Sequence, residues 1–90
     1  MKAALRIIML EDSPTDAEII QRYLIKKKPD LQFCLVTNRT AFQRELNHFK
    51  PDLILADNAL PQFNGSEALQ LVQESALDIP FILVTGSMTD

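Results

Sequence analysis

Three carboxylates and one hydroxyl stand directly after short apolar segments of this 90-residue chain. They are Glu11, Asp12, Asp57 and Thr85. Clustered carboxylates repel one another when ionised, and proteins that keep them charged generally do so with a hard divalent cation that takes oxygen ligands. Mg²⁺ is the natural candidate. A single acid at a strand end is often only a solvated turn residue or a helix cap, so the prediction of a magnesium site rests on the coincidence of three.

These groups can meet only if strands and helices follow one another in the right order. Four segments are almost wholly apolar and favour strands covered on both faces: residues 5–10, 31–36, 53–56 and 81–84. A first helix is predicted to begin after Ser13, because this hydroxyl N-cap precedes Pro14 at the first helical position and Asp16 in the first turn. The helix should end near residue 28, where three lysines precede Pro29.

Two further helices are predicted between the later strands. One follows the polar residues 37–40, and the other follows a loop over residues 57–65 that carries a proline and a glycine. Each has an apolar face that we interpret as packing on a sheet. The two faces are Phe42, Leu46 and Phe49, and Ala68, Leu69 and Val72.

Strands that alternate with helices predict βαβ units, a parallel sheet and right-handed crossovers, so the fold class is α/β. No linker, repeat or low-complexity segment divides the chain, and we expect one domain over residues 1–90. In an open parallel sheet, ligands bind outside the carboxyl ends of the strands. All four candidate residues follow such ends, so the topology predicts that they converge.

Composition excludes several classes of function. A net charge of −3 gives no basic surface for a phosphate backbone, so nucleic acid is not an expected partner. The apolar runs are far shorter than the roughly 20 residues that span a bilayer, the N-terminus lacks a signal peptide, and the single cysteine cannot form an internal disulfide. We therefore expect a cytoplasmic protein that does not associate with a membrane. Two glycines leave no phosphate-binding loop for nucleotide hydrolysis.

The spacing around the third acid is more distinctive. The run Asp57-Asn58-Ala59-Leu60-Pro61 is followed by Asn64-Gly65, with Glu11-Asp12 after the first strand and Thr85-Gly86 after the fourth. Together and in this order, these motifs resemble the receiver domain of two-component response regulators, over essentially the whole chain. The resemblance implies a flavodoxin-like, doubly wound parallel sheet with strand order 2-1-3-4-5.

The resemblance also implies a phosphorelay function. Asp57 would accept a phosphoryl group from a phosphohistidine of a sensor histidine kinase or phosphotransfer protein. Asp12, Asp57 and the backbone carbonyl of Ala59 would bind Mg²⁺ directly, and Glu11, where the family more often has aspartate, would act through a metal-bound water. Thr85 would bond a phosphoryl oxygen and move on activation. Such a domain signals by a change of shape and is not itself an enzyme.

The resemblance also implies a fourth helix, a fifth strand that carries a switch aromatic and ends in the site lysine, and a fifth helix, all of which would lie beyond residue 90. Residues 81–84 would then form an exposed apolar edge, which recruits a partner. From the sequence we expect either a domain that is incomplete at its C-terminus, as a fragment of a longer chain, or a dimer through this edge.

Two other functions stay open at this point. The domain could be a receiver-like module that is not phosphorylated and acts only as a protein-binding platform. Alternatively, Asp57 could be the nucleophile of a phosphatase, although Ala59 stands where such enzymes usually place a second acid. His48 is predicted to be a surface residue, Cys34 a core residue and the lysines at 26–28 a solvated helix end.

Overall fold

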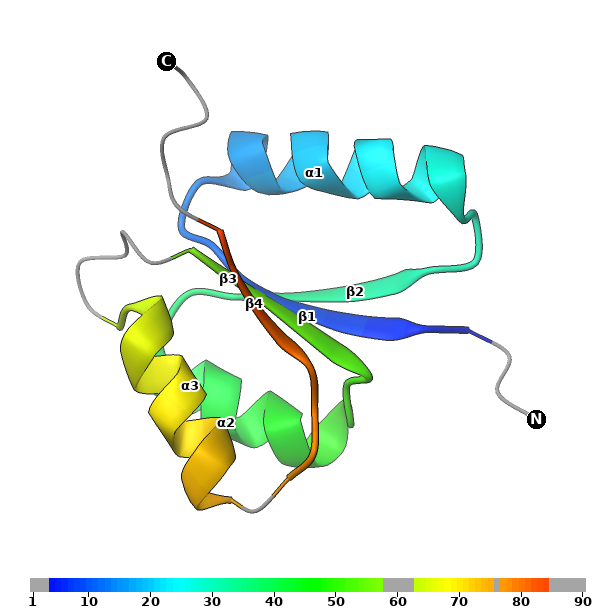
Figure 1. Cartoon of the computed structure of the whole chain (residues 1–90). Helices are drawn as coiled ribbons and strands as arrows, with labels where there is room; N and C mark the ends of the chain where they lie inside the picture. Colours follow the sequence, from blue (N-terminus) through cyan, green and yellow to red (C-terminus); the bar gives the residue numbers. More distant parts are fainter. Residues whose placement is uncertain (1–3, 58–62, 76, 85–90) are drawn as a thin grey trace.

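The computed structural model describes residues 4–57, 63–75 and 77–84. Within these residues the chain forms one parallel sheet of four strands in the order β2-β1-β3-β4, with a helix in each connection (Figure 1). The predicted α/β class and flavodoxin-like strand order are confirmed. The elements are β1 (Arg6–Leu10), α1 (Pro14–Lys27), β2 (Gln32–Val36), α2 (Arg39–His48), β3 (Leu53–Asp57), α3 (Gly65–Glu74) and β4 (Phe81–Val84).

The helices cover the two faces of the sheet unequally. Helix α1 lies on one face, and α2 and α3 lie on the other (Figure 1). The α1 face buries Ile7 and Met9 of β1 against Ala17. The other face carries the larger cluster, which contains Ile8, Leu10, Val36, Phe42, Leu46, Ile54, Ala56, Phe63, Ala68, Leu71 and Val72. Because β1 is buried on both faces, its sequence is apolar at every position after Arg6.

Each helix begins with a side-chain cap. Ser13 Oγ accepts a hydrogen bond from the Asp16 N–H (3.3 Å), and Asn38 Oδ1 accepts one from Ala41 N–H (2.8 Å). Asn64 and Glu67 form a reciprocal capping box, in which each side chain accepts from the other's backbone N–H. All three caps lie where the chain leaves the carboxyl ends of the strands, so the helix N-termini gather at that edge of the sheet.

At the amino ends of β1 and β3, Arg6 makes contacts with two other elements. Arg6 N–H donates to Asp52 Oδ2 (2.9 Å), and its Nη1 donates to the carbonyl of Phe49 (2.7 Å). The guanidinium carbon lies 5.6 Å from the centre of the Phe49 ring, and Asp52 N–H donates back to the Arg6 carbonyl (2.7 Å). We call Arg6, Phe49 and Asp52 the arginine clamp. It joins the start of β1, the end of α2 and the start of β3.

Most predicted faces are found, with two differences. In α3 the buried residues include Leu71, whereas Leu69 is only half-buried, because the helix turns Ala68, Leu71 and Val72 toward the sheet. Cys34 is half-buried at the edge of the larger cluster, since β2 is an outer strand. His48 is exposed, as predicted. No helix in the described ranges has the length and apolar character needed to cross a membrane.

Candidate functional site

Three acidic side chains meet at the carboxyl edge of the sheet. Carboxylate oxygens of Glu11, Asp12 and Asp57 all lie within 4.8 Å of one another. Glu11 and Asp12 directly follow β1, and Asp57 is the last residue of β3, the strand next to β1. The pairing of Leu10 with Ala56 brings the two strand ends level. We call these three side chains the acidic cluster.

The three acids differ in how far they are exposed. Glu11 is 7% exposed, Asp57 is half-buried, and Asp12 is exposed. The cluster is therefore closed on the Glu11 side, toward the sheet, and open to solvent at Asp12. A group arriving from solvent reaches the side chains of Asp12 and Asp57 more readily than that of Glu11.

Backbone groups fix Glu11 in this position. Its N–H donates to the Val36 carbonyl (3.1 Å), which continues the β1–β2 ladder by one residue. Its Oε2 accepts a hydrogen bond from the Ser13 N–H (3.1 Å) at the start of α1. Ser13 thus serves twice, because its side chain caps the helix while its backbone orients the acid. Sequence reasoning identified the cap but not the backbone contact, which leaves no signal in residue type.

The surroundings raise the pKa of Glu11 above its ordinary value of 4.5. Burial is the largest cause, because it disfavours the charged form. The Ser13 hydrogen bond acts in the opposite direction, and the negative charges of Asp57, Asp16 and Asp12 add to the increase. The cluster therefore stores like-charge repulsion that a bound cation would relieve.

The donor set fits a hard divalent cation. All three ligand candidates offer carboxylate oxygen, the ligand that Mg²⁺ takes, and neither histidine nor cysteine is among them. Oxygens on opposite sides of an octahedral Mg²⁺ ion lie about 4 Å apart, since each Mg–O bond is about 2.1 Å. Oxygens within 4.8 Å of one another can therefore reach a common ion with small side-chain adjustments.

Two of the predicted site residues, Ala59 and Thr85, lie outside the residues that the structure describes. Thr85 directly follows Val84, which pairs with Asp57 across β3 and β4. The other predicted site residues, Glu11, Asp12 and Asp57, are brought together as described above.

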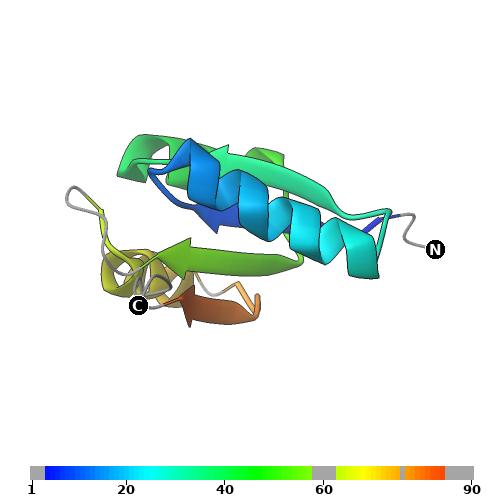
Figure 2. The same ribbon diagram turned by 90° about the horizontal axis from the view of Figure 1, so that it is seen from above.

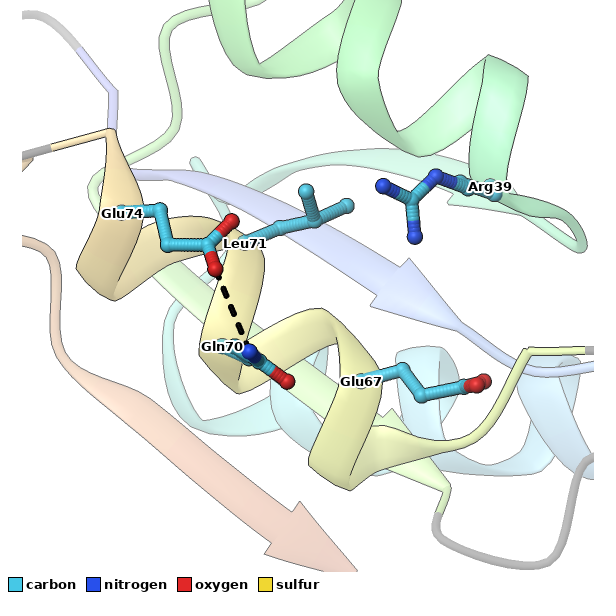
Figure 3. Close-up of a pocket in the computed structure, with 5 residues that line it drawn as sticks. All are labelled: Arg39, Glu67, Gln70, Leu71 and Glu74. Carbon is cyan, nitrogen blue, oxygen red and sulfur yellow. Dashed lines mark hydrogen bonds between the residues drawn. The ribbon is translucent and has the colours of Figure 1, made fainter.

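A separate polar hollow lies between α2 and α3, with a volume of about 160 Å³. Figure 3 shows Arg39 of α2 facing α3, which supplies Glu67, Gln70, Leu71 and Glu74. Gln70 Nε2 donates to Glu74 Oε2 (3.1 Å), one turn further along α3. None of these residues belongs to the acidic cluster, so the hollow is not part of the candidate site.

Comparisons with known proteins agree with the fold. The chain is 38% identical over 78 residues to the luminescence regulatory protein LuxO of Vibrio campbellii, in a match covering 87% of this chain and 17% of that protein. It is 32% identical over 85 residues to a protein-glutamate methylesterase/protein-glutamine glutaminase of Nitrosospira multiformis, covering 92% of this chain and 23% of that enzyme. The chain thus spans less than a quarter of the length of these two relatives.

A solved structure is also similar. The bacteriophytochrome response regulator AtBRR matches with a TM-score of 0.79 at 28% identity, over 97% of this chain and 70% of that chain. Residues 7–90 match the response regulator receiver domain family. The chain therefore belongs to the receiver-domain family of two-component response regulators.

Proposed function

We propose that Asp57 accepts a phosphoryl group in a Mg²⁺-dependent reaction and that the modified domain signals by a change of shape. The observation that carries this proposal is the meeting of three carboxylates from two strand ends within 4.8 Å. A carboxylate is a competent nucleophile for phosphoryl transfer when the donor is well positioned. The bond from phosphorus to the donor histidine nitrogen breaks, and a bond from phosphorus to an Asp57 carboxylate oxygen forms.

Asp12 and Asp57 would hold the ion directly, together with the carbonyl of Ala59, and Glu11 would act through a water. When bound, Mg²⁺ supplies positive charge that offsets the charge spread over the transferred oxygens. The chain itself supplies orientation. Glu11 is held by two backbone contacts, so it needs little reorganisation when the cation arrives.

Thr85 would carry the change of shape. Phosphorylation replaces one negative charge on Asp57 with nearly two and adds acceptor oxygens. The hydroxyl of Thr85 is a suitable donor to such an oxygen, because this residue directly follows Val84, the β4 residue opposite Asp57. Movement of Thr85 toward the phosphoryl group would couple the chemistry to β4.

The donor would be a sensor histidine kinase or a phosphotransfer protein, and the chain would act as a stoichiometric acceptor without turnover. The output of the whole protein and its cytoplasmic location stay predictions. The alternative is a receiver-like module that binds proteins without being phosphorylated. Both functions use the same fold, so only the chemistry of Asp57 separates them.

A small acyl phosphate tests the acceptor role. The chain is incubated with the donor and Mg²⁺, and its intact mass is measured. We expect a gain of one phosphoryl group that a chelator abolishes. A folded protein that gains no phosphoryl group would favour the binding module, and continued hydrolysis of donor in excess would favour a phosphatase.

Matched variants locate the reaction. Asp57→Asn should remove the adduct while the domain keeps its cooperative melt, because the variant also removes a repelling charge. Asp16→Asn is the control, since Asp16 lies in the first turn of α1, contributes negative charge to the same region and is not in the acidic cluster. Loss of the adduct in both variants would contradict a specific role for Asp57.

A further inference from the structure

Strand β2 is an outer strand of the sheet, on the side away from β4 (Figure 2). The receiver order 2-1-3-4-5 also leaves β2 outermost, because its further strand lies beyond β4. Among the elements that the structure describes, none pairs with the outer side of β2. Its residues, Gln32–Val36, include no charge and no proline, and Leu35 is 41% exposed. Natural sheets generally protect an edge with charge, proline or a covering element, so this edge is a template for another strand.

The backbone of β2 has a defined orientation. The Gln32 N–H donates to the Leu5 carbonyl (2.9 Å), so the backbone groups of Gln32 face β1. Alternate residues of a strand point their backbone groups to the same side. Phe33 and Leu35 therefore point their N–H and C=O groups outward. No hydrogen bond to these outward groups forms within the described ranges.

We infer that β2 pairs with β2 of a second copy of the chain, antiparallel about a two-fold axis beside Cys34. In this register, Phe33 of each copy exchanges two hydrogen bonds with Leu35 of the other, and every outward backbone group of β2 gains a partner. A shift of two residues in one direction would use Leu31, whose N–H already donates within the turn before β2. A shift in the other direction would use Thr37, which lies outside β2. The proposed register is thus the one that stays within the strand.

The side chains on the α1 face of β2 are complementary in this register. Phe33 packs on that face, and Leu35 pairs with Met9, which is buried there, so Leu35 lies on the same face. The exposed Leu35 of each copy would contact the half-buried Phe33 of the other. Two apolar cross-strand contacts would form, and the burial of Leu35 favours association.

The other face of β2 brings no repulsion to the axis. Cys34 packs at the edge of the larger cluster, and burial raises the pKa of its thiol above the ordinary value of 9.0. The negative charge of Glu45 raises this pKa further, and the positive charge of Arg44 lowers it. Arg44 and Glu45 form an ion pair (3.3 Å). A two-fold axis beside Cys34 therefore gathers two neutral thiols, two cations and two anions, whose charges are complementary.

Sedimentation of the chain over a range of concentrations tests the association. We expect a dimer whose dissociation constant rises about tenfold or more in Leu35→Lys, because an ammonium group then replaces the apolar contact with Phe33 in both halves of the interface. Leu77→Lys is the matched control, since Leu77 is 40% exposed and lies between α3 and β4, away from β2. Circular dichroism melts establish that each variant is folded. A native chain that is monomeric at all concentrations, or equal weakening by the two variants, would overturn the inference.

Cys34 reports the register, because it is the only cysteine of the chain. A pair of residues without hydrogen bonds in antiparallel strands has Cα atoms about 4.5 Å apart, within the range of about 4.4–6.8 Å found in disulfides. An added mild oxidant takes up the two electrons that the thiols lose, and the two protons go to solvent. The native chain should then form a disulfide-linked dimer faster than the double variant Cys34→Ser, Leu77→Cys, although Leu77 is the more exposed position. Equal or slower cross-linking through Cys34 would contradict the proposed register.

Amide hydrogen exchange locates the interface. The N–H groups of Phe33 and Leu35 should exchange more slowly as protein concentration rises, because each gains an intermolecular acceptor. Those of Phe81 and Leu83, on β4 at the other side of the sheet, should not change. Concentration-dependent protection at neither strand, or at β4 alone, would overturn the inference.

Discussion

The two ends of the sheet differ in the charged groups that they bring together. At the amino end, the Arg6 guanidinium donates to the Phe49 carbonyl and lies against the Phe49 ring, while the Arg6 backbone N–H donates to the Asp52 carboxylate. At the carboxyl end, Glu11, Asp12 and Asp57 bring like charges together, and burial and repulsion raise the pKa of Glu11. The same strands end in both regions. The difference separates a contact that stabilises the fold from an arrangement that costs stability unless a cation is bound.

Removing the clamp should have the largest effect on stability. Arg6→Ala deletes a charge-assisted hydrogen bond to the Phe49 carbonyl and the contact with its ring, while the backbone N–H bond to Asp52 is kept. We expect the free energy of unfolding to fall by about 2 kcal/mol in a urea titration. Arg22→Ala, which removes only the exposed pair with Glu18, should cost about 0.5 kcal/mol or less. Equal losses in the two variants would contradict the special role of the clamp.

Removing one charge from the acidic cluster should raise the free energy of unfolding, whereas removing the clamp should lower it. In metal-free buffer, Glu11→Gln should raise the free energy of unfolding by about 1 kcal/mol at pH 7, because it removes a buried charge and keeps an acceptor for the Ser13 N–H. Urea titrations of both proteins with a chelator present measure the difference. Destabilisation by Glu11→Gln would show that Glu11 is better accommodated as an anion than its surroundings indicate.

The pH dependence of the stability of Glu11→Gln gives a further test. The folded state raises the pKa of Glu11, so protonated Glu11 favours folding. This contribution is fully present below the ordinary value of 4.5 and is lost as pH rises through the folded-state pKa. Without metal, the advantage of Glu11→Gln over the native chain should therefore grow between about pH 4 and pH 7. An advantage that is independent of pH would contradict titration of Glu11 as its cause.

The smallest expected effect on stability comes from backbone strain at Lys50, next to Phe49 of the clamp. Lys50 follows α2 with φ of 55°, the left-handed conformation that a β-carbon disfavours. Its N–H donates to the Glu45 carbonyl (3.3 Å), as expected of a residue that ends a helix in this way. Lys50→Gly should raise the free energy of unfolding by about 0.5 kcal/mol. A matched Lys28→Gly, at a residue with φ of −146°, should not be stabilising.

The sequence predicts the acidic cluster better than the clamp, for a physical reason. Apolar runs locate the strands within about one residue, and parallel strands bring their carboxyl ends to one edge, so Glu11, Asp12 and Asp57 could be predicted to meet. Nothing local indicates that Arg6 reaches Phe49 and Asp52. Those contacts join residues 43 and 46 positions apart and depend on the register of β1 against β3.

Helix phase was predictable only in part. The face of α2 through Phe42 and Leu46 was predicted correctly, because its apolar residues are few and regularly spaced. In α3, Leu69 and Leu71 are both apolar, and packing against the sheet selects Leu71. The Ser13 N–H contact with Glu11 was missed because any residue except proline can supply a backbone donor.

A paramagnetic ion tests the central claim most directly, because it reports which residues surround the cation. Mn²⁺ takes oxygen ligands as Mg²⁺ does, and it broadens the NMR signals of nearby nuclei. Small amounts should first broaden the amide signals of Glu11, Asp12, Ser13 and Asp57, and excess Mg²⁺ should restore them. Signals of Arg6, Phe49 and Asp52 at the other end of the sheet should persist. Equal broadening at both ends, or none at the acidic cluster, would contradict a shared cation site.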